Sequence, residues 1–118
     1  MARSNPYHPS IKAGEDLHTR YAALRVGDAG ELRETDAAGQ VIVGSVNETA
    51  DEGHAVGFYN TGIVNFIASA AITVGHSIVS SATKGQVSGV AANIANNVGW
   101  VALTAADAAG DTFQAVKA

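Results

Sequence analysis

The sequence VGSV at positions 43–46, followed by TADEG at 49–53, has a near copy later in the chain: VGWV at 98–101, followed by TAADAAG at 104–110. A Gly-Gln-Val triplet precedes each copy, at 39–41 and 85–87, and a largely apolar run follows each, at 56–59 and 112–116. Each copy is typical of two strands, a short Ala/Asp turn closed by glycine, and a further strand. Two copies, with an insertion in the second, are too few for a solenoid. The repeat predicts a duplicated set of β-hairpins that closes on itself.

The glycines that end the two Ala/Asp turns are predicted to be structural equivalents. Gly53 closes the first turn and Gly110 closes the second. Glycine is favoured where the chain needs a positive φ, because it has no Cβ to clash with the backbone. We therefore expect both residues to have a positive φ.

Short apolar or β-branched segments bounded by glycine-rich turns continue along the chain from Tyr21. Such spacing is typical of a small β-barrel or sandwich. We predict an all-β fold of about eight short strands, with one or two short helical turns at 104–109 and 49–52, where alanine is frequent. The candidate strands are 21–26, 31–35, 41–46, 56–59, 62–68, 77–81, 86–90, 98–103 and 111–116.

The first 20 residues differ in character from the rest. They contain both prolines, Pro6 and Pro9, and show no helical or strand periodicity. Proline biases the preceding residue toward extended geometry. The sequence therefore predicts an extended N-terminal arm over residues 1–20 and a β-barrel or sandwich domain over residues 21–118. Tyr7 and Ile11 are the expected apolar anchors of the arm.

Composition narrows the class of protein. The 118 residues have a net charge of −4 and no visible basic cluster, which makes nucleic acid a poor candidate partner. No stretch approaches the roughly 20 apolar residues of a membrane span. The absence of cysteine excludes disulfides and thiolate metal sites. Large apolar residues are few, so burial against other copies of the chain would add to a modest core.

The residues that carry catalysis in other proteins do not form a recognisable pattern here. None of the histidines has the spacing of a helical zinc pair, and His54 and His76 each follow a turn glycine. Ser88 has only one of the two glycines of a nucleophile elbow, with no assignable base. No phosphate-binding glycine motif is present. We therefore expect no catalytic site, no metal, no cofactor and no enzymatic activity.

One lysine leaves an alternative open. Lys84 is expected at a hairpin tip between two strands, where biotinyl and lipoyl domains carry their cofactor-bearing lysine. Its neighbours, Thr83 and Gly85, differ from the flanking residues of those domains. A small β-barrel ligand-binding or carrier module is thus the alternative reading of the chain.

A further set of motifs consists of VGSV and TADEG, AAITVGHSI at 70–78, GQV at 85–87, VGWVALTAA at 98–106 and Gly110-Asp111. On these motifs, residues from about 41 to 116 resemble the phage capsid cement, or head decoration, proteins of the small all-β class. Members of that family commonly carry an Ala-Ala-x-Ile-x-x-Gly-Asp-x-Val element. Here His76 stands where aspartate is usual.

The resemblance implies a non-enzymatic virion protein that binds the outer surface of a phage head and stabilises the capsid. Its partners would be the major capsid protein and other copies of itself in a homotrimer. It would be made in the cytoplasm of a bacterial host and end on the capsid exterior. The arm would supply contacts to the shell, and its candidate capsid-binding residues are Pro6, Tyr7, His8, Pro9 and Ile11.

Overall fold

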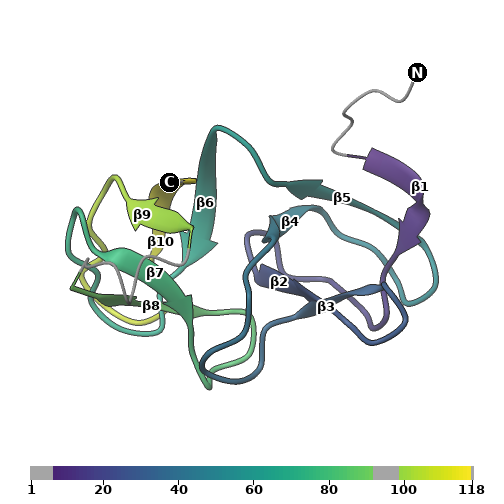
Figure 1. The fold of residues 1–118 in the computed structure, drawn as a ribbon, viewed down its shortest axis with the longest axis horizontal. Coiled ribbons are helices and arrows are strands. Elements are labelled where there is room, and N and C mark those ends of the chain that lie inside the picture. Colours follow the sequence, from purple (N-terminus) through teal and green to yellow (C-terminus); the bar gives the residue numbers. More distant parts are fainter. Residues whose placement is uncertain (1–6, 92–98, 118) are drawn as a thin grey trace.

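The computed structural model describes residues 7–91 and 99–117, and in these residues it shows ten β-strands and no helix (Figure 1). The all-β prediction is thus confirmed. The first five strands are β1 (Tyr7–Lys12), β2 (Ala23–Val26), β3 (Leu32–Glu34), β4 (Gly44–Glu48) and β5 (Ala55–Tyr59). The second five are β6 (Ile63–Ile67), β7 (Ser77–Ser80), β8 (Val87–Val90), β9 (Trp100–Ala102) and β10 (Thr112–Lys117).

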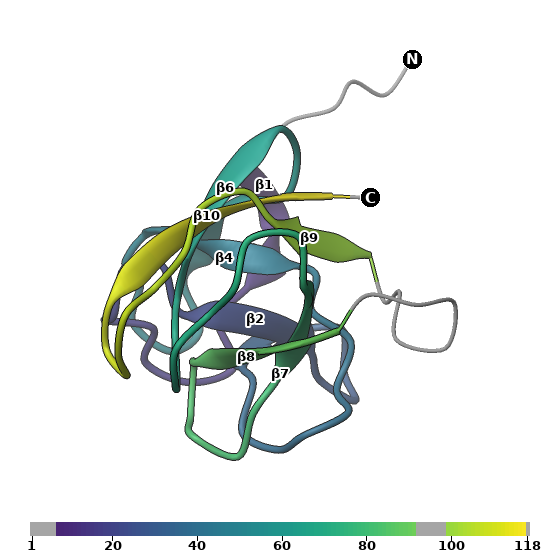
Figure 2. The same ribbon diagram turned by 90° about the vertical axis from the view of Figure 1, so that its left-hand side faces the viewer.

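The two halves of the chain form two antiparallel sheets with the same topology. The strand orders are β1-β5-β4-β2-β3 and β6-β10-β9-β7-β8, so each strand of the second sheet takes the place of the strand five positions earlier. A parallel bridge joins Ala13 to Leu32 in the first sheet, and Ala68 to Val87 in the second. These bridges roll each sheet into a barrel-like lobe. We call residues 7–59 the first lobe and residues 63–91 and 99–117 the second lobe. Figure 1 shows them side by side, and in Figure 2 the second lobe faces the viewer, in front of the first.

Backbone hydrogen bonds establish the equivalence of the lobes residue by residue. Leu17 and Ala50 exchange N–H···O bonds of 2.8 and 3.0 Å, and Ile72 and Ala106 exchange bonds of 2.9 and 3.2 Å. This predicted duplication is therefore present in three dimensions.

The two turn glycines occupy matching positions, as predicted. The Gly53 N–H donates to Ala13 O at 2.8 Å, and the Gly110 N–H donates to Ala68 O at 2.8 Å. Their φ angles are 86° and 90°. Both residues therefore turn the chain in the same way in the two lobes.

The two helical turns expected from alanine content are not found. Residues 49–52 and 104–109 are non-helical, and each segment contains an antiparallel bridge to the opposite side of its lobe. Their amide groups bond to partners far along the chain rather than four residues back. Long-range pairing therefore overrides the intrinsic helix propensity of alanine.

One part of the sequence repeat does not correspond in space. The counterpart of Gly85 is Gly30, because the two residues lie in the turns before β8 and β3 and have φ angles of 73° and 83°. Gly39, which begins the first Gly-Gln-Val triplet, lies instead in the connection between β3 and β4. The triplet match is therefore coincidental.

The N-terminal segment differs from the expected arm. Residues 7–12 form β1, which pairs with β5 from Tyr7↔Gly57 to Lys12↔Ala55 across an irregular register. Ala13 and Leu17 are buried in the first core. Pro9 fits this assignment because β1 is the outer strand of its sheet, where a missing N–H is tolerated. Residues 7–20, which were expected to form an arm outside the domain, thus belong to the folded body.

Each lobe has its own apolar core, supplied by alternating side chains of its strands. In β6 and β10, for example, Val64, Phe66, Phe113 and Ala115 point inward. The core of the first lobe contains Ala13, Leu17, Ala22, Leu24, Leu32, Val46, Val56 and Phe58. The larger core of the second lobe is made by Val64, Phe66, Ala68, Ile72, Ile78, Val87, Trp100, Ala102, Ala106, Phe113 and Ala115, joined by Ala23 and Ile42 of the first lobe.

Hydrogen bonds between the lobes add to this shared core. The turn before β8 inserts into the first lobe, where the Ala23 N–H donates to Gly85 O at 2.9 Å and the Gly85 N–H donates to Thr35 O at 2.7 Å. A Cβ on Gly85 would lie 2.6 Å from Glu34 Oε1 and 3.0 Å from Ala22 Cβ, so the approach requires glycine. Trp100 Nε1 adds a 3.1 Å bond to Ile42 O.

Candidate functional site

An apolar groove runs between the two lobes and is the first of two candidate sites. Its volume is about 380 Å³. The residues that define it here are Ile11, Val26, Val41, Val43 and Phe58 of the first lobe and Trp100 and Lys117 of the second. Leu32, Ile42, Gly30, Asn60 and Gly99 complete its lining. Most of these residues belong to the first lobe.

Two of the five large apolar side chains that are exposed among the described residues line this groove. Val41 is 75% exposed and Val26 is 54% exposed. A second hollow of about 360 Å³ shares Val26, Val41 and Val43 and extends the groove toward Arg25 and Gln40. Single exposed valines are common on soluble proteins, whereas a contiguous apolar surface marks a place of contact.

The charged groups that line the groove and its extension are cationic. Lys117 Nζ lies 6.0 Å from the centre of the Trp100 ring. The Arg25 guanidinium has a loose ion pair with Asp36, with Nη2 and Oδ2 3.7 Å apart. Its Nε is buried and has no hydrogen-bond partner among the residues that the structure describes. At this end of the groove the charge of Arg25 is therefore only loosely paired.

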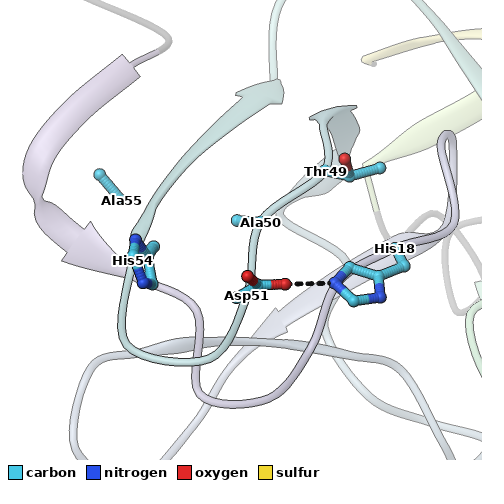
Figure 3. Close-up of a pocket in the computed structure, with 6 residues that line it drawn as sticks. All are labelled: His18, Thr49, Ala50, Asp51, His54 and Ala55. Carbon is cyan, nitrogen blue, oxygen red and sulfur yellow. Dashed lines mark hydrogen bonds and ion pairs between the residues drawn. The ribbon is translucent and has the colours of Figure 1, made fainter.

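The second candidate is a polar hollow at the surface of the first lobe (Figure 3). It has a volume of about 400 Å³ and is lined by His18, Thr49, Ala50, Asp51, His54 and Ala55. His18 Nε2 and Asp51 Oδ1 are 2.6 Å apart, on two turns that the Leu17–Ala50 bridge brings together. The His54 ring lies on the other side of Asp51 in Figure 3.

Asp16 stands next to this pair and completes a set of three metal-ligand types. Oxygen or nitrogen atoms of Asp16, His18 and Asp51 all lie within 4.8 Å of one another. Asp16 Oδ1 also accepts a 2.9 Å hydrogen bond from the Glu52 N–H. All three side chains are exposed, so the arrangement is a hydrogen-bonded surface turn that has the donor types for a divalent cation.

The second lobe has the same turn pair without this polar set. Since Leu17 corresponds to Ile72, the counterparts of Asp16 and His18 are Ala71 and Thr73. The turns therefore form without the Asp16 carboxylate and the His18 imidazole. Sequence reasoning missed the His18–Asp51 pairing because the residues are 33 positions apart and only the Leu17–Ala50 bridge joins their turns.

The predicted capsid-binding residues do not form one site in the structure. Tyr7, His8 and Pro9 lie in β1, and Pro6 lies outside the described residues. Ile11 is half-buried against the first core and lines the apolar groove. Of the five predicted contact residues, Ile11 thus belongs to a candidate site.

The residues weighed for chemistry are not assembled into a catalytic set within 7–91 and 99–117. Ser88 lies in β8, and no hydrogen bond there joins it to a histidine or a carboxylate. Lys84 is at the β7–β8 turn, as expected, but its Nζ pairs with Glu15 Oε1 of the first lobe at 2.9 Å. That hydrogen bond raises the pKa of Lys84 above its ordinary value. In the described part of the chain no helix is long and apolar enough to cross a membrane.

Comparison with known proteins adds no relative to this picture: no protein-family model matches the chain, and no curated protein matches it.

Proposed function

We propose that the chain is a structural virion protein that binds the outer surface of a phage head and stabilises the capsid. The observation that carries the proposal is the apolar groove on a small body of two β-lobes. A surface of this kind suits a contact with another protein better than a chemical reaction. The resemblance of residues 41–116 to head decoration proteins points in the same direction.

Under this proposal the partners are the major capsid protein and other copies of the chain, as a homotrimer on the capsid exterior. The protein would be made in the bacterial host cytoplasm. Repeated copies strengthen a shell because many weak contacts act together. No catalytic step, metal or cofactor is required for this role.

The direct test is co-sedimentation with shells assembled from the major capsid protein encoded in the same genome. We expect the chain to sediment with the shells at a fixed copy number and to raise the temperature at which heads open. Replacing Ser88, His54 or His76 by alanine should leave binding unchanged. Failure of the wild-type chain to sediment with shells would contradict the proposal.

A small ligand-binding or carrier module is the competing function, and the apolar groove is the feature that favours it. Two observations count against it. The groove leaves Val41 largely exposed, and Lys84 is paired at the contact between the lobes. A mass increment on Lys84 in protein purified from its natural host would favour the carrier alternative.

A further inference from the structure

We propose that the apolar groove binds an extended peptide segment in which apolar side chains alternate with carboxylates. Under the proposed function, on which this part rests, the segment belongs to the capsid shell. The groove would then be the surface through which the decoration protein attaches, rather than an N-terminal arm.

The shape of the groove favours an extended chain over a small molecule. The two hollows share Val26, Val41 and Val43, so they form one continuous path along the first lobe from Lys117 to Arg25. A small ligand normally has most of its surface enclosed by its pocket. Here Val41 is 75% exposed and forms a rim rather than a wall. A segment lying across this rim would cover it.

The apolar lining specifies the side chains that would enter. Of the lining residues, Phe58 and Trp100 are almost fully buried, whereas Ile11 and Val43 are half-buried. These partly covered apolar residues offer a contact surface for one or two apolar side chains of a partner. Apolar anchors seated in desolvated pockets supply most of the affinity of protein contacts.

The charges specify the rest of the segment. Lys117 at one end makes no ion pair within the part of the chain that the structure describes. At the other end, the partly exposed Arg25 guanidinium has only the loose 3.7 Å pair with Asp36. A carboxylate is the group that an arginine binds best. The chain is acidic overall, with a net charge of −4, so this cationic groove contrasts with the rest of its charge.

The chain contains a well-matched control for a test by mutation. Val74 is 56% exposed, against 54% for Val26, and it lies in the second lobe away from the groove. Val41→Asp and Val26→Asp place a carboxylate against the incoming carboxylates, whereas Val74→Asp adds the same charge elsewhere. All three side chains are exposed, and a thermal melt of each variant checks that it folds.

The first measurement is co-sedimentation with capsid shells. We expect Val41→Asp to weaken binding by about tenfold or more, Val26→Asp to weaken it clearly, and Val74→Asp to leave it unchanged. If wild-type protein binds shells and Val41→Asp binds equally well, the groove proposal is overturned while the proposed function stands.

The second measurement needs no capsid. A six-residue peptide alternating leucine and aspartate is titrated into the isotope-labelled protein, and backbone amide signals are followed by NMR. Shifts should concentrate at Val41, Ile42 and Trp100, and should be lost in Val41→Asp but kept in Val74→Asp. A peptide alternating leucine and lysine should cause little change.

The two measurements separate the two proposals. If the wild-type chain ignores shells but the acidic peptide shifts the groove signals, the capsid function fails and the groove proposal stands. Equal binding of the lysine peptide, or acidic-peptide shifts spread away from the groove, would overturn the groove proposal.

Discussion

Replacing Gly53 and Gly110 by alanine should cost the same free energy of unfolding in both lobes. Their φ angles are 86° and 90°, and an added Cβ would meet no atom within 4 Å at either position. The cost is therefore backbone strain alone, about 1 kcal/mol for each substitution. The residues lie in different lobes, so the double variant should lose about 2 kcal/mol.

The assay is urea denaturation followed by circular dichroism, with a thermal melt in parallel. For a domain of this size, 1 kcal/mol corresponds to a fall in Tm of about 4 °C. Asparagine at either position should cost less than alanine, because its side chain tolerates a positive φ. Gly89→Ala is the control: its backbone is not left-handed and its nearest new contact, Ile72 Cδ1, is at 3.4 Å. That change should be neutral or mildly stabilising.

If the two lobes are equivalent, Gly53→Ala and Gly110→Ala must lose similar amounts of the free energy of unfolding. If one single variant is neutral while the other loses 2 kcal/mol or more, the two turns are not equivalent. If both variants were as stable as wild type, neither position would require glycine for its positive φ, and the reasoning from φ would be wrong.

Three further predictions concern the core, the contact between the lobes and an acidic group. A chain that begins at His18 lacks β1 and the buried Leu17, and should fail to give a cooperative thermal melt. Trp100→Phe leaves Ile42 O without its 3.1 Å donor and should cost about 1–3 kcal/mol in urea melts; an unchanged midpoint would refute the role of this bond. Burial raises the pKa of Glu34, although the charge of Lys84 acts against this. Stability from protonated Glu34 is present below its ordinary pKa of 4.5 and is lost as the pH rises through the raised value, so the advantage of Glu34→Gln over wild type should grow from pH 4.5 to pH 7. A difference that stays flat or shrinks over that range would contradict the assignment.

The strands from β2 onward could be predicted from the sequence because glycine punctuates them. Each of the nine segments expected from residue 21 contains one of the strands β2–β10 or overlaps it. The equivalence of Gly53 and Gly110 also follows from local turn chemistry. What local signals could not give was the pairing: the residues at 49–52 and 104–109 resemble helix starts until their long-range bridges are known.

The candidate sites were largely hidden from sequence reasoning. Ile11 was expected as an apolar anchor, but of an arm, because prolines suggested a segment outside the fold. The groove joins Ile11 to Val41 and Trp100, and the polar hollow joins His18 to Asp51. Each site depends on how the lobes roll up and dock, which no spacing along the chain encodes.

The assignment of each lobe to one uninterrupted half of the chain has a consequence for biosynthesis. All five strands of the first lobe leave the ribosome before β6, so they can pair while the rest is still being made. This earlier lobe has Phe58 as the aromatic ring of its core, whereas the later one contains Trp100, Phe66 and Phe113. Ala23 and Ile42 of the earlier lobe pack in the core of the later lobe, so they remain uncovered until that lobe has been synthesised. The nascent chain thus exposes an apolar face until its own second half covers it, and such exposed surface favours aggregation during that interval.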